Sequence, residues 1–220
     1  MVCANQNVEQ RPDIEPARWK VEVFEEDSLA PGYWFVSPYE KNGYKLPGRS
    51  WIGPHIYDGK GELIWSGSHM FNRINVMDFK IQNVDGTDLL SMLYAVEGNA
   101  YLLDNRYRVK QTVFTGQTGV TFNMHDFHTV NDGTRYLYLQ RNITEASEEL
   151  SMEEIGFDGK CKITFPGFEE RDVKSKNKLF KWDATGIISM NESTMQFAPV
   201  PVRCASYWDY LYATHSLELN

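Results

Sequence analysis

A repeated pattern of short alternating segments constrains this fold more than any other feature of the sequence. The stretch MDFKIQNVDGTDLLSML, from Met77, aligns with HDFHTVNDGTRYLYL, from His125, with one residue deleted before the turn. The stretch YDGKGELIWSG, from Tyr57, likewise aligns with LDNRYRVKQTV, from Leu103. A further copy, RDVKSKNKLFKW, begins at Arg171. The repeating unit is therefore two β-hairpins in about 45–50 residues, which is typical of a four-stranded propeller blade.

Apolar and polar residues alternate over short runs that are rich in β-branched and aromatic side chains, and Gly, Asp and Asn separate the runs. This period of two predicts strands. We therefore expect an all-β fold, a β-propeller with four-stranded blades. The 220 residues hold roughly three blades, whereas propellers typically close with about four to eight. We interpret residues 19–220 as a single partial propeller domain, about the N-terminal half, after a disordered or extended segment, 1–18.

Three blades leave sheet edges exposed, and exposed edges pair readily with strands of other chains. We therefore expect a homo-oligomer or a second chain that completes the propeller. The net charge of -8 argues against binding to nucleic acid or to anionic membranes. Apolar runs long enough to form a membrane-spanning helix are absent from the sequence, and so is a visible signal peptide. We expect no membrane insertion.

Cysteines and sequons leave the cellular compartment open. Cys3, Cys161 and Cys204 allow one disulfide with one unpaired thiol, or three reduced thiols. The absence of C-x-x-C spacing disfavours a zinc site built on thiolates. The sequences at Asn142 and Asn191 match the glycosylation sequon, at a frequency close to chance.

The stretch NMHDFHTV raises the question of a metal or catalytic site. In a regular strand His125 faces one way, and Asp126 and His128 face the other, so the two histidines do not readily share a metal ion. We predict no metal and no cofactor. We expect Asp126 to be structural and to cap the start of a strand, as Asp78 and Asp209 would in the other copies. His125 replaces a methionine of the preceding copy, so the repeat does not require it, and an imidazole there can donate a hydrogen bond or act as an acid or base.

Seven stretches, in this order and from about Trp19 onward, resemble the fungal arylsulfotransferase-like β-propeller proteins. They are LAPGYWFVSPY, GPHIYDGKGELIWSG, NVMDFKIQNVDGTDLL, NMHDFHTVNDGTRYLYLQRN, DGKCKITFPGFEERDV, LFKWDATGIISMNEST and CASYWDYLYATHS. The resemblance implies a disulfide between Cys161 and Cys204, which favours the secretory pathway or the extracellular space and fits a glycoprotein. The full family chain is about twice as long, which agrees with half a propeller.

The resemblance also implies two activities. Bacterial sulfotransferases of this architecture use a histidine in the channel that carries the sulfuryl group. Some fungal relatives, encoded with natural-product genes, are instead hetero-Diels–Alderases that join a tropolone or polyketide quinone methide to a sesquiterpene. Many relatives have the motif Trp-Asp-aromatic-x-His-x-Asn-Ser near this point. This chain, with WDYLYATHS, has Tyr212 in place of that histidine, Thr214 in place of the asparagine, and His215 three residues after Tyr212. This departure disfavours sulfotransfer through that position.

We therefore expect a pericyclase of the hetero-Diels–Alder type in secondary metabolism, with His125 and Tyr212 as catalytic residues. The alternatives are an arylsulfotransferase that uses His125, and a non-catalytic or truncated propeller that binds a partner. Such a cyclase mainly holds a small apolar or aromatic substrate in a reactive geometry, and the 14% aromatic content suits a pocket of this kind. The same aromatic residues could simply fill the spaces between blades.

Four further side chains are candidates for binding the substrate. Three of them, Arg73, Lys80 and Arg141, are cationic and would bind an anionic group of the substrate. Each could instead be a solvated charge at a blade edge. His215 follows Tyr212 on the same predicted element. The four residues are Arg73, Lys80, Arg141 and His215.

Overall fold

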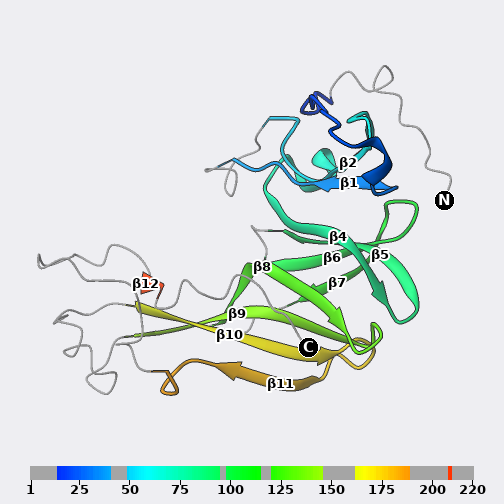
Figure 1. Ribbon diagram of the computed structural model, residues 1–220. Coiled ribbons are helices and arrows are strands. Elements are labelled where there is room, and N and C mark those ends of the chain that lie inside the picture. Colours follow the sequence, from blue (N-terminus) through cyan, green and yellow to red (C-terminus); the bar gives the residue numbers. More distant parts are fainter. Residues whose placement is uncertain are drawn as a thin grey trace, which may run out of the picture. The chain divides into compact units, whose positions relative to one another are not determined.

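Strands account for nearly all of the regular structure in this protein (Figure 1). The computed structural model describes residues 14–40, 49–94, 98–114, 120–145, 162–188 and 208–209. Within these residues the helical elements are two short 3-10 turns, η2 (Glu26–Ser28) and η3 (Ser68–Phe71). The expected all-β fold is confirmed. The strands are β1 (Tyr33–Val36), β2 (His55–Asp58), β3 (Leu63–Ser66), β4 (Val76–Val84), β5 (Thr87–Tyr94), β6 (Asn99–Leu103), β7 (Val109–Phe114), β8 (Val120–Val130), β9 (Arg135–Glu145), β10 (Lys162–Asp172), β11 (Lys178–Asp183) and β12 (Trp208–Asp209).

The strands form three sheets that follow the order of the chain. They are β1-β2-β3, β4-β5-β6-β7 and β8-β9-β10-β11, and β12 joins the third sheet by pairing in parallel with β10. Successive strands pair in antiparallel register, for example Tyr33 with Asp58 and Leu90 with Leu103. Such an up-and-down order needs only short hairpin connections.

Three of the hairpin turns share one aspartate motif. The Oδ1 atom of Asp58 accepts hydrogen bonds from the backbone N–H groups of Lys60 and Glu62, both at 2.9 Å. Between β6 and β7, Asp104 makes the equivalent pair of bonds at 2.8 and 3.0 Å. Between β10 and β11, Asp172 accepts two such bonds at 3.0 and 2.7 Å. An aspartate side chain thus stabilises a turn at all three aligned positions, although the turn after Asp172 is one residue longer than the other two.

The chain divides into two compact units. The first comprises Met1–Ile81 and Leu89–Val113, and the second comprises Gln82–Asp88 and Phe114–Asn220. The first unit holds the β1–β3 sheet and most of the β4–β7 sheet, and its core is built from the side chains that both sheets and η3 contribute. These core residues are Ile56, Trp65, Phe71, Ile74, Val76, Phe79, Leu90, Met92, Tyr94 and Leu103.

The second unit contains β8–β12 together with the tip of the β4–β5 hairpin. Aromatic residues dominate its core, and Phe127 lies with its ring centroid 5.4 Å from that of Tyr136. Tyr138, Leu139 and Phe165 are buried beside them. This core lies directly behind the strand that carries the histidine motif, so it is the scaffold on which the candidate site is built.

Candidate functional site

A large bulge interrupts β8 within the histidine motif. The pairing of β8 with β9 runs to Phe122 opposite Gln140, breaks, and resumes at Phe127 opposite Tyr138. Five positions along β8 therefore correspond to two along β9. The intervening residues, 123–126, leave the ladder, and bulges of this kind redirect side chains and are common beside active sites. The regular alternation expected for this strand does not hold there.

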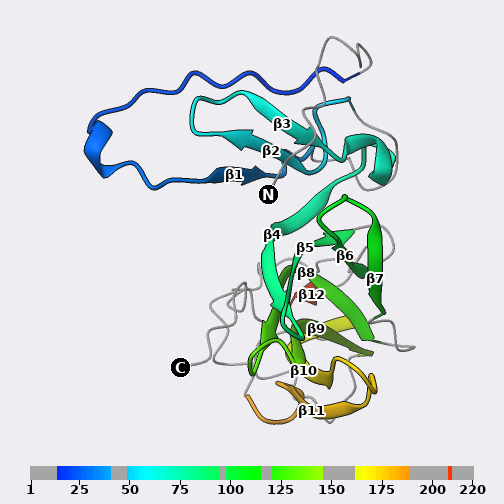
Figure 2. The same ribbon diagram turned by 90° about the vertical axis from the view of Figure 1, so that its right-hand side faces the viewer.

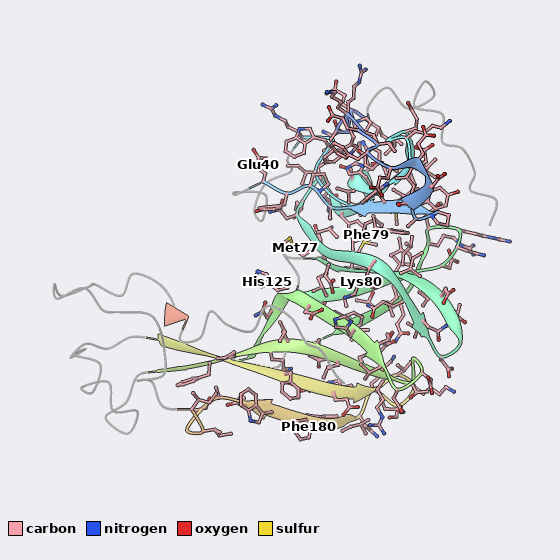
Figure 3. All side chains as sticks on the ribbon, viewed as in Figure 1. Glu40, Met77, Phe79, Lys80, His125 and Phe180 are labelled. Atoms are coloured by element: carbon pink, nitrogen blue, oxygen red, sulfur yellow. The ribbon has the colours of Figure 1, made fainter. Side chains whose placement is uncertain are left out.

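His125 lies in this bulge (Figure 3). It is held by Asn123. The Nδ1 atom of His125 lies 2.5 Å from Oδ1 of Asn123, and the backbone N–H of His125 donates to the same oxygen at 3.2 Å. Because a carboxamide oxygen can only accept, Nδ1 carries the proton. The lone pair of the neutral ring is then on Nε2, while the protonated ring has an N–H donor there.

Asn123 is itself buried, with 7% of its surface exposed, whereas His125 is half-buried. A buried acceptor fixes the orientation of the ring that it binds more firmly than a mobile surface group would. Sequence reasoning identified His125 but missed Asn123. The sequence contains one indication of Asn123. It precedes His125 by two residues, and a regular strand places two such residues on the same face.

Asp126 and His128 form the second interaction in the motif. Oδ1 of the buried Asp126 lies 2.7 Å from Nε2 of His128, whose side chain is 37% exposed. Asp126 is the seventh residue of β8 and lies directly before pairing with β9 resumes at Phe127, so it does not lie at the start of the strand, where we expected it. Its equivalent, Asp78, contacts Lys80 at 2.8 Å. The structural role predicted for both aspartates remains a prediction.

Gln82, from the tip of the β4–β5 hairpin, secures the strand after the bulge. Its Nε2 donates to the carbonyl of Phe127 at 3.0 Å, and its Oε1 accepts from the backbone N–H of Thr129 at 2.7 Å. The side chain of Gln82 thus forms the hydrogen bonds that a neighbouring strand would otherwise form with the backbone groups on either side of His128. Sequence analysis did not identify Gln82, because the contact joins segments 45 and 47 residues apart.

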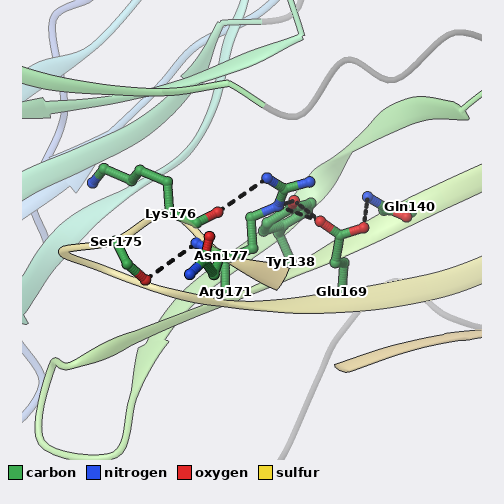
Figure 4. A network of polar contacts seen from close by, with 7 residues as sticks. All are labelled: Tyr138, Gln140, Glu169, Arg171, Ser175, Lys176 and Asn177. Carbon is green, nitrogen blue, oxygen red and sulfur yellow. Dashed lines mark hydrogen bonds and ion pairs between the residues drawn. The ribbon is translucent and has the colours of Figure 1, made fainter. Parts of the chain in front are cut away.

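A polar network is buried in the same unit, between β9 and β10 (Figure 4). The fully buried carboxylate of Glu169 accepts hydrogen bonds from Tyr138 at 2.8 Å and from Gln140 at 3.2 Å, and it pairs with Arg171. Burial, and then the hydrogen bond and charge of Glu169, raise the pKa of Tyr138, which stays a neutral donor. The network explains how a charge is tolerated in this core.

The predicted substrate-binding residues are distributed over both units. Arg73 follows η3 and Lys80 lies in β4, both in the first unit, and Lys80 is paired with Asp78. Arg141 lies in β9 of the second unit, with a side chain outside the described part. Asn142 follows it in the same strand, also without a described side chain, as is the case for Asp209 in β12. The remaining predicted residues, Tyr212, His215, Cys161, Cys204 and Asn191, lie outside the described residues.

Three or more His, Cys, Asp or Glu side chains in a metal-binding arrangement do not occur among the described residues. A helix long and apolar enough to cross a membrane is likewise absent from this part of the chain. Comparisons with models of protein families, with curated proteins and with solved structures found no match for this protein.

Proposed function

We propose that this protein is a small-molecule enzyme of the β-propeller type and that it promotes a hetero-Diels–Alder reaction. The proposal combines the ordered motifs that resemble fungal arylsulfotransferase-like proteins with sheets that are each an up-and-down meander, as propeller blades are. The reaction joins a quinone methide to a sesquiterpene olefin. A second copy or another chain would supply further blades.

The observation that carries the proposal is the position of His125 in the β8 bulge, with Nδ1 held by the buried Asn123. In the cycloaddition one C–C and one C–O bond form, three π bonds become two σ bonds and one π bond, and no atom leaves. No net proton transfer is needed. The protein therefore has to orient the partners and to stabilise the charge that develops on the carbonyl oxygen.

Protonated His125 can meet the second requirement. Because Nδ1 is directed at Asn123, the ring would donate its Nε2–H to the carbonyl oxygen of the oxadiene, which lowers the energy of the orbital that accepts electrons. The fixed orientation of the ring means that little freedom is lost when this bond forms. Asn123 acts here as a positioning residue.

The same geometry favours one second candidate, an arylsulfotransferase. In neutral His125 the lone pair lies on Nε2, so this atom could attack the sulfur of an aryl sulfate. An N–S bond would form as the S–O bond breaks and the phenolate leaves, and a second phenol would then take the sulfuryl group from Nε2. The two candidates thus require opposite protonation states of one nitrogen.

Product analysis tests the proposal. The protein is mixed with humulene and a tropolone quinone methide generated in place, and the yield and stereochemistry of the adduct are compared with the protein-free reaction. We expect an altered product ratio that is lost in His125→Ala and kept in His69→Ala, a control at a histidine whose side chain is exposed. An unchanged ratio with the wild-type protein would contradict the proposal. Phenol release from an aryl sulfate would favour the second candidate instead.

A further inference from the structure

A pocket lined by aromatic side chains lies in the first unit. It has a volume of about 310 Å³ and is lined by Trp19, Lys20, Val21, Trp34, Val36 and Tyr57. We call it the aromatic pocket. Its volume is at the lower end of the range for small-molecule sites, about 300–1,000 Å³, so it suits one small molecule.

The segment before β1 forms one wall of this pocket by running along the β1–β3 sheet (Figure 2). Two hydrogen bonds hold the segment in place. The Tyr57 hydroxyl donates to the carbonyl of Ala17 at 3.0 Å, and the backbone N–H of Glu15 donates to Oγ of Ser50 at 3.2 Å. The wall is therefore anchored to the sheet and is present without a ligand.

Close backbone approach completes the wall at Gly61. A Cβ atom at this position would lie 3.0 Å from Cγ2 of Val21 and 3.3 Å from Cβ of Trp19. The φ angle of Gly61 is +83°, a conformation that residues with a side chain rarely adopt. Glycine therefore allows the segment to pass close to the β2–β3 turn.

Three rings define the interior of the pocket. Trp34 on β1 is the direct cross-strand partner of Tyr57 on β2, so both side chains are on one face of the sheet. The ring of Trp19 meets that of Tyr57 edge-on, with centroids 5.9 Å apart. Tyr57 is buried, whereas Trp19 and Trp34 remain 47% and 63% exposed. Indole rings left so exposed around a hollow provide stacking surfaces for another ring.

The polar groups of the pocket select the charge of its ligand. The Tyr57 hydroxyl is already used by Ala17, and burial raises the pKa of this phenol, so it stays neutral. The lining includes one residue with an ionic side chain, Lys20, and a cation beside the pocket would repel a cationic ligand and attract an anionic one. Lys20 pairs with Glu22, but both side chains are exposed, and such a pair is weak enough to exchange partners.

We propose that the aromatic pocket binds a planar aromatic carboxylate, with its ring between Trp19 and Trp34 and its carboxylate on Lys20. The proposal is independent of the function proposed for His125, because the pocket lies wholly within the first unit. An aromatic carboxylate satisfies both features of the site at once, the ring surfaces and the single cation.

Three probes of equal ring size and different charge test this assignment. They are 2-naphthoate, neutral 2-naphthol and the 2-naphthyltrimethylammonium cation, each titrated into the full chain by isothermal calorimetry. We expect 2-naphthoate to bind most tightly and the cation most weakly. Equal affinity for all three would show a non-selective apolar surface, and tightest binding of the cation would show an aromatic cage for ammonium groups. Either result overturns the proposal.

Two variants assign the contributions. Lys20→Met should weaken 2-naphthoate by about fivefold and leave 2-naphthol unchanged. Trp34→Ala should weaken both by about tenfold or more. Because Trp34 is largely exposed, its removal should leave the fold intact, which circular dichroism checks. Lys60→Met and Trp182→Ala, which alter residues outside the lining, are the matched controls. Unchanged 2-naphthoate affinity in Trp34→Ala also overturns the proposal.

Discussion

The carboxylate of Asp126 lies 2.7 Å from Nε2 of His128, two residues further along the same strand. The preceding copy of the repeat makes the equivalent contact between Asp78 and Lys80 at 2.8 Å. In both copies the aspartate is the more buried partner. The repeat thus preserves a contact of the aspartate with the residue two positions on, while that residue changes from lysine to histidine.

This pairing predicts an asymmetry between its two members. His128→Ala removes the imidazole that contacts the buried Asp126 carboxylate, so we expect a loss of about 1–2 kcal/mol in the free energy of unfolding. Asp126→Asn removes the buried charge and leaves an exposed histidine, so we expect a smaller loss. Urea unfolding of both variants measures the difference. Equal losses, or a larger loss for Asp126→Asn, would mean that the carboxylate depends mainly on other partners.

The positive φ angle of Gly61 and its close contact with the pocket wall lead to a second prediction, which links stability to ligand binding in the aromatic pocket. Gly61→Ala places a side chain at a positive φ and against Val21, so we expect a loss of about 1–2 kcal/mol in stability. We also expect weaker binding of 2-naphthoate, because the pocket wall has to move. The control is Gly59→Ala, since a Cβ there meets no atom within 4 Å. Its stability should stay within about 0.5 kcal/mol of the wild type. Equal effects of the two substitutions would contradict this account.

The buried network around Glu169 predicts that removing the cation, Arg171, lowers stability more than removing the charge of the anion, Glu169. Arg171→Leu leaves a fully buried carboxylate without its cation, and we expect a loss of about 3 kcal/mol in stability. Glu169→Gln keeps the shape and removes the charge, so it should cost far less. The double variant should be more stable than Arg171→Leu alone, a coupling that urea unfolding measures.

The neighbouring pair of Arg135 and Glu170 provides a matched control for that cycle. Its atoms lie 2.9 Å apart, but the two side chains are 42% and 20% exposed. We therefore expect Arg135→Leu to cost less than about 1 kcal/mol. If Arg135→Leu cost as much as Arg171→Leu, burial would not be the reason for the difference.

His55 makes stability depend on pH. Burial lowers its pKa below 6.5, an effect that the hydrogen bond of Nε2 to the carbonyl of Trp51 partly opposes. Below pH 6.5 the unfolded state therefore binds more protons at this residue than the folded state does. Stability should fall as the pH decreases from about 6.5 towards the folded-state pKa, and should be fully retained above 6.5.

Urea unfolding at a series of pH values checks this direction. His55→Gln, which does not titrate and can still donate a hydrogen bond, should show a weaker dependence on pH between about 7 and 5 than the wild type. His69→Gln, the same substitution at a histidine with an exposed side chain, is the control. A wild-type stability that increases as the pH falls through this range would contradict the assignment.

Local patterns made much of the fold predictable. Alternation identified the strands, and the turn aspartates Asp58, Asp104 and Asp172 could be aligned because each acts on backbone only two to four residues away. The β8 bulge was not predictable, because register depends on the partner strand. The alternation expected for residues 123–126 was therefore wrong, whereas comparison of the repeat copies distinguished His125.

Long-range contacts explain the remaining omissions. Glu169 and Tyr138 are 31 residues apart, and one sequence does not reveal that two polar residues of separate strands share a buried position. The aromatic pocket depends on Tyr57 reaching Ala17 across 40 residues. Trp19 and Trp34 were noticed only as part of the aromatic content, because their concave arrangement arises in the folded chain.

The most direct test of the central claim is the pH dependence of the cycloaddition in wild type and His125→Ala. The rate without protein is subtracted at each pH. If protonated His125 donates its Nε2–H, the catalysed rate should decrease as the pH is raised between about 5 and 8, the range in which histidine side chains change charge. His125→Ala should be slow at every pH. A wild-type rate that rises with pH through this range, or a rate unaffected by His125→Ala, would contradict the account.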